Sequence, residues 1–595
     1  MPRQIDEEDE AYQRPFDQKQ FIRLLRYLIP HRIRVAYVIV LVIVAGFVNQ
    51  ATPYLMKIGI DTYIKSMDLR GLNLLAGLLL ACNVTGWIAA YLRTYLMAYI
   101  GQNVLYTMRQ ELFTHIQWLS FRFYDSRPAG KIIARITGDV GTLNDLITNG
   151  IINIVADSVN LVIIVIALLS MHVKLALLSF CILPFMAIWA LRLRPRIRLL
   201  WRMVRARISA INANLNESIL GMKVTQAFVR EDRNLENFRD LLKKNLDTWM
   251  KAISLNVIFG PVVEVIGTIG TCVVIWYGVR EIASGRMTVG MIMAFLSYLG
   301  RFWAPVSTLT NFYGQVQAAM ASSERVFEFL DTRPEIEEKP GAVALPPIKG
   351  AVNFEHVSFG YEPGQVVLKD FSLSVRPGET IALVGPTGAG KTSIVNLLNR
   401  FYDPTEGRIT IDGYDIRDVT LKSLRSQIGI VLQDTVLFSG SIEDNIRYGK
   451  LDASMEEIEE AARIANIHDF IMQLPQGYKT EIEERGSKLS VGQRQLLSLA
   501  RAVLANPRIL ILDEATSNID ARTEMLLQEA IERVLKGRTS FVIAHRLSTI
   551  RNANRIVVIE NGRIAQMGTH EELINTPGIY RDLSLSQVRE QSLAV

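Results

Sequence analysis

The sequence predicts an α-helical membrane domain of six spans followed by a domain of the α/β class. Six long apolar stretches occupy the first half of the chain, whereas the second half alternates short apolar strands with helical segments. The 595 residues exceed what one hydrophobic core holds, and 49% hydrophobic against 21% charged residues is an apolar balance for a soluble protein. We expect four parts: a disordered N-terminus (1–15), a membrane domain (16–330), a linker (331–345) and the α/β domain (346–595).

The N-terminal residues are acidic and polar, which indicates disorder, and we expect no cleavable signal peptide. From Phe16 to Leu28, apolar residues recur at helical spacing with basic residues between them. This pattern favours an amphipathic helix on the membrane surface over an ordinary surface helix. The three cysteines lie inside apolar stretches without metal-ligand spacing, so we interpret them as packing residues.

Six apolar stretches are the candidate membrane spans, and a buried core helix does not explain six in succession. A charge facing lipid costs about 2.5–3.5 kcal/mol, so Asp157, Glu264 and Arg301 should face the bundle interior or a wet cavity. They would serve there in a substrate path or in a structural ion pair. The predicted spans are Val35–Met56, Gly71–Leu92, Ile147–Met171, Leu175–Leu191, Ala252–Val279 and Met287–Thr310.

Basic residues gather after the second and fourth predicted spans, including seven arginines between Arg192 and Arg207. The loops on the opposite side are short and carry few basic residues. The positive-inside rule therefore predicts that both termini are cytoplasmic, and we expect the protein to lie in the cytoplasmic membrane. The long connections on this side have helical patterns that break at Phe123–Gly130 and Gly221–Arg230. We expect these bends to contact another domain rather than to form simple hairpin turns.

A charged stretch with two prolines, residues 331–341, indicates a domain boundary. Beyond it, short apolar segments alternate with helical ones, which is typical of the α/β class. Asn561-Gly562 predicts a hairpin turn. The candidate strands are Val352–Tyr361, Thr380–Val384, Arg408–Asp412, Ile428–Leu432, Ile509–Leu512 and Ser540–Ala544.

One motif dominates the α/β domain and makes it a P-loop NTPase by sequence pattern. The stretch Gly385-Pro386-Thr387-Gly388-Ala389-Gly390-Lys391-Thr392 fits G-x-x-x-x-G-K-[ST] between a predicted strand and a helix that starts at Ser393. Its glycines let main-chain N–H groups surround a polyphosphate at a helix N-terminus. Lys391 reaches the β- and γ-phosphates, and the Thr392 hydroxyl suits Mg²⁺. The sequence therefore predicts binding of ATP with Mg²⁺.

Two further motifs follow this loop. The apolar strand Ile509–Leu512 ends in Asp513, which suits Mg²⁺ directly or through water, and Glu514, which is placed to polarise an attacking water. Leu489-Ser490-Val491-Gly492-Gln493 precedes a helical stretch, and Ser490 has capping-box spacing to Gln493. This helix start is either a second anion site or a plain helix cap.

Together these residues resemble the ATP-binding cassette (ABC) superfamily, in the type of exporter whose single chain carries six spans and one ATPase domain. The resemblance covers nearly the whole chain from about Phe16. It implies that Tyr361 stacks on adenine, that Gln433 contacts Mg²⁺ and water, and that His545 contacts the γ-phosphate. By themselves these three are a strand-end aromatic, a solvated polar residue and a buried histidine.

The resemblance implies a complete set of site residues. The nucleotide-binding residues are Tyr361, Gly385, Thr387, Gly388, Gly390, Lys391, Thr392, Ser393, Ser490, Gly492, Gln493 and Asp520. The metal-binding residues are Thr392, Gln433 and Asp513, and the catalytic residues are Glu514, His545 and Gln433.

In this family two ATPase domains pair head to tail, so that ATP lies between the P-loop of one and the signature sequence, here Leu489–Gln493, of the other. The bends near Phe123–Lys131 and Met222–Arg230 resemble the coupling helices that transmit this motion to the spans. Two departures matter: Val491 and Glu483 stand where glycine is common. A β-branched residue adds bulk and disfavours positive φ. We hypothesise that the partner is a different half-transporter rather than a second copy.

The expected function is ATP-driven export of an amphipathic substrate, such as a drug, lipid or peptide. Membrane lipids surround the protein, and we expect no nucleic-acid partner. An ATP-gated channel or a lipid flippase on the same scaffold is the alternative. A soluble ATPase, such as a repair or translation factor, is disfavoured by the six spans. The generic apolar character of the predicted spans leaves the substrate itself open.

Overall fold

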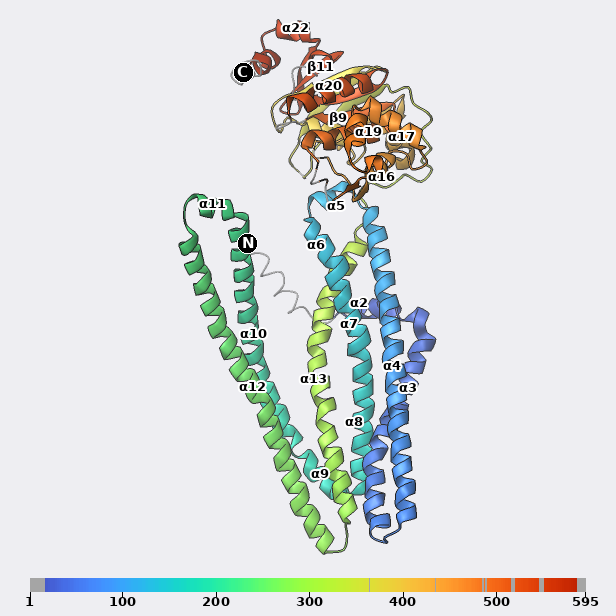
Figure 1. Ribbon diagram of the computed structural model, residues 1–595, viewed down its shortest axis with the longest axis vertical. Helices are drawn as coiled ribbons and strands as arrows, with labels where there is room; N and C mark the ends of the chain where they lie inside the picture. The colour runs from blue at the N-terminus through green and yellow to red at the C-terminus, as the bar shows by residue number, and fades with distance from the viewer. Residues whose placement is uncertain are drawn as a thin grey trace. The chain divides into compact units, whose positions relative to one another are not determined.

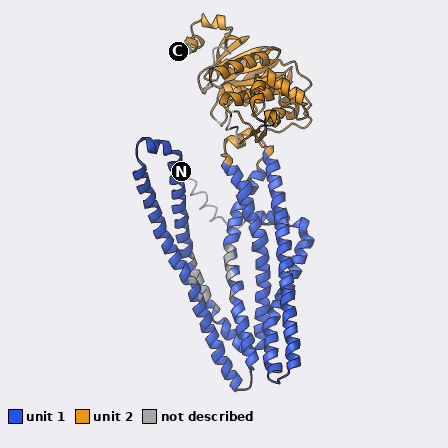
Figure 2. Cartoon of the chain, viewed as in Figure 1, with its two compact units in different colours: residues 1–116, 130–331 blue, residues 117–129, 332–595 orange. Residues whose placement is uncertain are grey.

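The computed structural model describes residues 17–362, 364–433, 435–483, 486, 489–514, 520–544 and 550–585. The chain divides into two compact units, coloured separately in Figure 2. The helical unit contains Met1–Ile116 and Gly130–Asp331, and the α/β unit contains Gln117–Ala129 and Thr332–Val595. The short segment 117–129 therefore packs with the α/β unit, although it lies in sequence between helices of the other unit.

The helical unit contains helices long and apolar enough to cross a membrane. Within the described residues there are five such stretches: Ile29–Ile64, Leu69–Gln117, Ala129–Met171, Glu231–Ala283 and Val289–Val306. The fourth predicted span, Leu175–Leu191, begins in α9 (Val173–Phe180) and continues in α10 (Leu183–Leu220). The interruption precedes Pro184 in the first turn of α10, where proline suits a helix start because its missing N–H is not needed. The helical membrane fold predicted from sequence is confirmed.

Several helices continue well beyond the predicted spans. Helix α4 (Leu69–Gln117) has 49 residues without proline, and α12 (Glu231–Ala283) has 53 residues. Figure 1 shows α10 and α12 side by side, joined by the short helix α11 (Met222–Ala227). The remaining helices of this unit are α2 (Gln18–Arg26), α3 (Arg32–Ile58), α6 (Ala129–Ala134), α7 (Val140–Asp145), α8 (Ile152–Met171) and α13 (Val289–Asp331); one-turn elements are η1 (Ile29–His31), η2 (Gly59–Ile64), η3 (Arg135–Asp139) and η4 (Leu146–Ile151).

The amphipathic helix expected near the N-terminus is α2, which begins after Asp17, whose side chain accepts a hydrogen bond from the N–H of Lys19. It is attached to the ends of two long helices. Arg23 pairs with Asp331 of α13 at 2.7 Å, and the Tyr27 hydroxyl donates to Glu111 of α4 at 2.7 Å. These polar contacts fix α2 to the protein in addition to any membrane contact of its apolar face.

Helices α3, α8 and α13 pack against one another. The Tyr298 hydroxyl and the Arg301 guanidinium of α13 donate to the main-chain carbonyls of Gln50 and Asn49 of α3, both at 2.6 Å. Arg301 is exposed on this chain, and this hydrogen bond gives its guanidinium a partner on a neighbouring helix. Asp157 is partly buried, whereas Glu264 is exposed on this chain.

The α/β unit is built on a central six-stranded sheet in the order β12-β11-β3-β10-β9-β6. Strands β11, β3, β10, β9 and β6 pair in parallel, and β12 is antiparallel to β11. Ile381 and Leu383 of β3 enter one hydrophobic cluster, whereas Ala382 and Val384 enter another on the opposite face. Burial on both faces explains why the strand reads as a continuous apolar segment.

The predicted turn at Asn561-Gly562 is confirmed. Both residues have positive φ, 50° and 80°, as a two-residue type I′ hairpin requires. The strand β2 (Leu368–Val375), which pairs with β1 in an antiparallel sheet of order β2-β1-β4-β5, was not predicted. The strands are β1 (Val352–Phe359), β3 (Thr380–Val384), β4 (Glu406–Ile411), β5 (Tyr414–Asp415), β6 (Ile428–Val431), β7 (Gly440–Ser441), β8 (Glu481–Ile482), β9 (Ile509–Glu514), β10 (Thr539–Ala544), β11 (Arg555–Glu560) and β12 (Arg563–Gly568).

Helices pack on both faces of this sheet, since each of its two hydrophobic clusters contains helical residues, such as Leu496 in one and Ile394 in the other. The segment 117–129 contributes the short helix α5. The helices of the α/β unit are α5 (Phe121–Asp125), α14 (Lys391–Leu398), α15 (Leu421–Arg425), α16 (Ile442–Arg447), α17 (Met455–Ile464), α18 (His468–Gln473), η5 (Gly477–Lys479), α19 (Val491–Ala505), α20 (Ala521–Leu535) and α22 (His570–Ile574).

A buried ion cluster joins the segment after α6 to α13. Asp139 is 7% exposed and accepts hydrogen bonds from Ser322 Oγ at 2.9 Å and Arg325 Nε at 3.1 Å. Arg135 pairs with the same carboxylate at 2.7 Å. One buried carboxylate therefore bridges two guanidinium groups.

We predict that Asp139→Ala lowers the free energy of unfolding of the helical unit by about 3 kcal/mol, because the two arginines lose their shared buried carboxylate. Asp240→Ala is the control, since Asp240 and Lys244 form an exposed pair at 2.5 Å that contributes less than about 1 kcal/mol. Thermal unfolding in detergent, followed by scanning fluorimetry, measures both. Equal shifts for the two variants would contradict the stabilising role of the buried cluster.

Candidate functional site

The predicted phosphate loop lies between β3 and α14, as the sequence pattern requires. Gly385 has φ +153°, and a Cβ there would lie 2.2 Å from the carbonyl oxygen of Ile559. Gly390 has φ +107° immediately before the first residue of α14. A side chain at either position would strain the loop or collide with a neighbour. The loop conformation before the N-terminus of α14 therefore requires glycine at both positions.

Lys391 is the first residue of α14, and its side chain folds back over the loop. Its Nζ donates to the carbonyls of Gly385 at 2.7 Å and Pro386 at 3.0 Å. Burial lowers the pKa of Lys391, and the negative charge of Asp513 opposes that effect. A bound polyphosphate would add negative charge beside the ammonium and favour its protonated form.

The parallel strands bring the candidate polar residues to one edge of the sheet. β10 pairs with β3 on one side and β9 on the other, so that Ile543 lies opposite both Leu383 and Asp513. Carboxyl ends of parallel strands meet at the same edge, where α/β proteins bind ligands. Lys391 and Thr392 follow β3, Gln433 follows β6, and Asp513 and Glu514 end β9.

The exposure of these residues differs. Thr392 and Gln433 are exposed, and Asp513 is partly buried. An alcohol, an amide and a carboxylate oxygen form a donor set that suits Mg²⁺, a hard cation that usually takes few protein ligands together with phosphate oxygens. Glu514 is the last residue of β9, and its side chain is not among those that the structure describes. His545, which follows β10 in sequence, also lies outside the described residues.

Tyr361 lies next to the helix that follows the phosphate loop. Its hydroxyl is 3.1 Å from Oγ of Ser393 and accepts from Nδ2 of Asn396 at 3.2 Å. Ser393 itself is buried. The structure thus places the aromatic ring predicted for adenine stacking beside α14, although the two are 32 residues apart in sequence.

The predicted helix cap at Ser490 is confirmed. The Ser490 hydroxyl accepts from the N–H of Gln493 at 3.2 Å, and the Gln493 side chain accepts from the N–H of Ser490 at 2.9 Å. Val491 is the first residue of α19. Its backbone is helical, so the position does not require a positive φ, and only the bulk of the side chain, 38% exposed, distinguishes it from glycine. Gly492 behind it is buried.

Asp520 also begins a helix. Its side chain accepts from the N–H of Thr523 at 3.0 Å and caps α20. Hydrogen bonds from Thr523 hold the pKa of Asp520 below its ordinary value, so the cap is a carboxylate at neutral pH. A nucleotide contact at this residue would be additional to its capping role.

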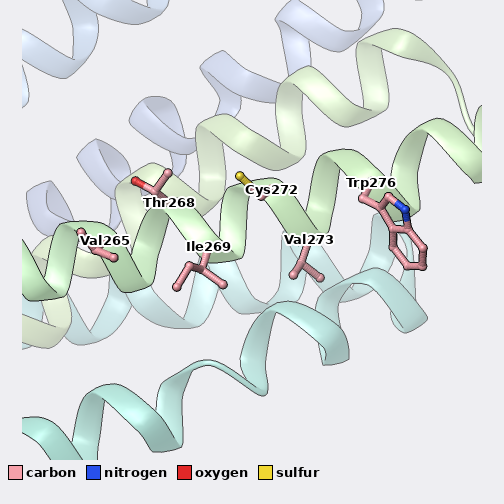
Figure 3. A pocket seen from close by; sticks show the side chains of 6 residues that line it. All are labelled: Val265, Thr268, Ile269, Cys272, Val273 and Trp276. Carbon is pink, nitrogen blue, oxygen red and sulfur yellow. The ribbon is translucent and has the colours of Figure 1, made fainter.

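Apolar cavities lie in the helical unit, and α12 contributes to two of them. One, of about 430 Å³, is lined by one side of α12, and Figure 3 shows its side chains: Val265, Thr268, Ile269, Cys272, Val273 and Trp276. The other, of about 890 Å³, lies between α10 and α12. Arg192 and Arg196 line it together with Trp189, whose Nε1 has no hydrogen-bond partner among the described residues. This cavity combines an apolar wall with cationic and N–H donor groups.

Sequence reasoning did not single out the contacts around α5. Arg122 donates to the main-chain carbonyl of Tyr361, and the Tyr402 hydroxyl donates to Asp125. The turn-rich stretch at Phe123–Gly130 indicated a contact segment, but no local pattern identifies partners more than 200 residues away.

Comparisons with known proteins agree with this arrangement. The family model described as the ABC transporter transmembrane region matches residues 35–306, and the model described as ABC transporter matches residues 368–517. The chain is 45% identical to an uncharacterized ABC transporter ATP-binding protein of Bacillus subtilis, over 97% of this chain and 96% of that protein. It is 38% identical to an ATP-dependent lipid A-core flippase of Syntrophus aciditrophicus, covering 96% and 95% of the two chains. A second Bacillus subtilis relative, provisionally named a multidrug export ATP-binding/permease protein, is 39% identical over 94% of this chain and 98% of that protein.

These matches extend over both units and nearly the full length of each relative. The domain that contains the phosphate loop is an ATPase domain, and the apolar helices make the protein a multi-pass membrane transporter. The chain belongs to the ABC transporters, in which ATP hydrolysis is coupled to transport, with the transmembrane region and the ATPase domain fused in one polypeptide.

Proposed function

We propose that this protein exports amphipathic molecules, such as drugs, lipids or peptides, across the cytoplasmic membrane. The proposal rests on one observation. The same chain contains a phosphate loop, over which Lys391 folds back, and helices apolar enough to span a bilayer. Both termini are cytoplasmic, because the arginines between Arg192 and Arg207 follow the positive-inside rule. ATP then reaches its site from the cytosol.

The nucleotide site divides its tasks among the strands that end at one edge of the sheet. The loop N–H groups, the N-terminus of α14 and Lys391 hold the phosphates. Thr392, Gln433 and Asp513 would hold Mg²⁺, which supplies charge neutralisation on the phosphate oxygens when bound. Glu514 orients and polarises the attacking water, and His545 contacts the γ-phosphate. Tyr361 stacks on the adenine ring.

The substrate class follows from the cavities of the helical unit. The cavity between α10 and α12 offers apolar walls to a hydrocarbon body, while Arg192, Arg196 and the Trp189 N–H offer donors to a polar or anionic head. Two relatives have names that refer to multidrug export and to lipid A-core flipping. An amphipathic substrate suits both the cavity and these relatives. A lipid flippase or an ATP-gated channel on the same scaffold is the alternative.

The site requires a second chain. The signature helix α19 presents its N-terminus with Ser490 and Val491 exposed, which suits the phosphates of ATP bound to another ATPase domain. The turn at α11 exposes Val224, Phe228 and Val229, with 62%, 72% and 80% of their surfaces accessible. Exposed apolar groups of this kind are typical of interaction surfaces. Since Val491 adds bulk where the signature meets phosphate, the partner is a different half-transporter whose own signature serves the stronger site.

We predict that Glu514→Gln lowers ATP hydrolysis by about 10²–10⁴-fold while ATP binding persists, because the amide no longer accepts a proton from water. Phosphate release and nucleotide binding by the purified transporter measure the two effects. Glu571→Gln, a change at an exposed residue of α22, should leave both unchanged. Normal turnover by the Glu514 variant would refute its assigned role.

Export and channel activity differ in their energetics. An exporter in inside-out vesicles should accumulate a fluorescent amphiphile against its gradient only while ATP is hydrolysed. A channel should let the gradient dissipate once ATP is bound, including with Glu514→Gln. ATP-dependent dissipation without accumulation would therefore exclude the export proposal.

The partner proposal is tested by purifying this chain alone. We expect little ATPase activity, and an increase on adding the different partner chain, because two equal sites with bulky Val491 are both weak. Val491→Gly should raise the activity of the chain purified alone. Robust activity of the unmodified chain, with the mass of a symmetric dimer, would remove the heterodimer proposal.

A further inference from the structure

The short helix α5 contacts the predicted adenine-binding aromatic directly, and both lie in the α/β unit. Arg122 donates through Nη2 to the main-chain carbonyl of Tyr361 and through Nη1 to Glu335 at 3.1 Å. Asp125 accepts a hydrogen bond from the Tyr402 hydroxyl. Burial and this hydrogen bond raise the pKa of Tyr402, so the hydroxyl stays protonated and remains a donor. Both ends of α5 are thus fixed by side chains of defined geometry.

Tyr361 and Tyr402 form one aromatic group with Phe359. The Tyr361 ring meets the Tyr402 ring edge-on, with 5.1 Å between the ring centroids and 89° between the ring planes. It meets the Phe359 ring in the same way, with 4.9 Å between the centroids and 78° between the planes. Tyr402 is 6% exposed. Since the rings interlock, a change in the position of Tyr402 would change the plane that Tyr361 offers to a base.

The same helix is also linked to the phosphate loop. Phe121 stacks on Phe401 at 4.6 Å and 28°, directly beyond the last turn of α14. Arg425 donates to the carbonyls of Asn399 and Arg400 at 3.2 and 2.8 Å and thereby holds that end of the helix. The eight residues of α14, from Lys391 to Leu398, span about 12 Å and connect the phosphate loop to this contact. At the other side, the Tyr361 hydroxyl bonds to Ser393 and Asn396 of α14.

We propose that Arg122 and Asp125 are positioning residues that orient Tyr361, directly and through Tyr402, for stacking on the adenine base, so that α5 responds to the base as well as to the phosphates. The inference rests on the proposed function in assigning the base to Tyr361. A coupling between two sites is reciprocal. If the docking of α5 strengthens base binding, base binding strengthens the docking of α5 by the same factor.

A purely structural role for these contacts has a different consequence. Loss of packing at α5 would weaken the whole ATPase domain and would affect phosphate binding and base binding together. Loss of ring orientation affects only ligands that possess a base. A nucleotide and a base-free polyphosphate therefore distinguish the two roles.

The experiment uses the full-length transporter with its Mg²⁺-dependent binding of a fluorescent ATP analogue, displaced either by ATP or by inorganic tripolyphosphate. The variants are Arg122→Gln, Tyr402→Phe and Asp125→Ala. We expect the apparent Kd of ATP to rise about three- to tenfold, since each change removes one hydrogen bond that fixes the aromatic group. The Kd of tripolyphosphate should stay within about twofold of the unmodified value.

Two further variants serve as controls. Asp125→Asn should restore ATP affinity, because its amide oxygen accepts from the Tyr402 hydroxyl as the carboxylate does. Arg127→Gln changes an arginine of the same segment that lies over the Phe123 ring at 4.6 Å, and it should leave both Kd values unchanged.

The outcomes separate this inference from the proposed function. Equal weakening of ATP and tripolyphosphate, or an unchanged ATP affinity in Tyr402→Phe, overturns the positioning role. Tyr402→Phe retains the packed ring, so it answers the question even if Arg122→Gln does not fold. Failure of the unmodified transporter to bind ATP would instead overturn the proposed function.

Discussion

The parallel pairing of β3, β10 and β9 is the constraint on which the nucleotide site depends. Because parallel strands end at one edge of a sheet, the phosphate loop after β3 and Asp513 near the end of β9 lie at the same edge although they are separated by more than a hundred residues. Apolar side chains on both faces of β3 fix this alignment. A one-residue slip of β9 would exchange its two buried faces and withdraw Asp513 from the vicinity of Lys391.

Local patterns were sufficient to predict much of the fold and part of the site. The P-loop spacing, the capping box at Ser490 and the Asn561-Gly562 turn are each determined within a few residues, and the structure contains all three. Strand β2 was not predicted because its alternation of exposed and buried positions gives a weaker signal than a continuous apolar segment.

The remaining features depend on partners that are distant in sequence. Arg122 and Tyr361 are 239 residues apart, and Asp139 and Arg325 are 186 residues apart. No periodicity in the sequence encodes such a pairing. The sequence therefore indicated that α5 lies in a turn-rich contact segment, but it did not identify the residues to which α5 is hydrogen-bonded.

The length of α4 has a mechanical consequence. At 1.5 Å per residue its 49 residues measure about 74 Å, well over twice the roughly 30 Å of hydrocarbon in a bilayer. No proline interrupts the hydrogen bonding within this helix, so α4 tilts as a stiff rod. Tilting a rod of that length by about 5° displaces one end by about 6 Å relative to the other. A tilt of only a few degrees therefore moves one end of α4 by about the length of a side chain relative to the other.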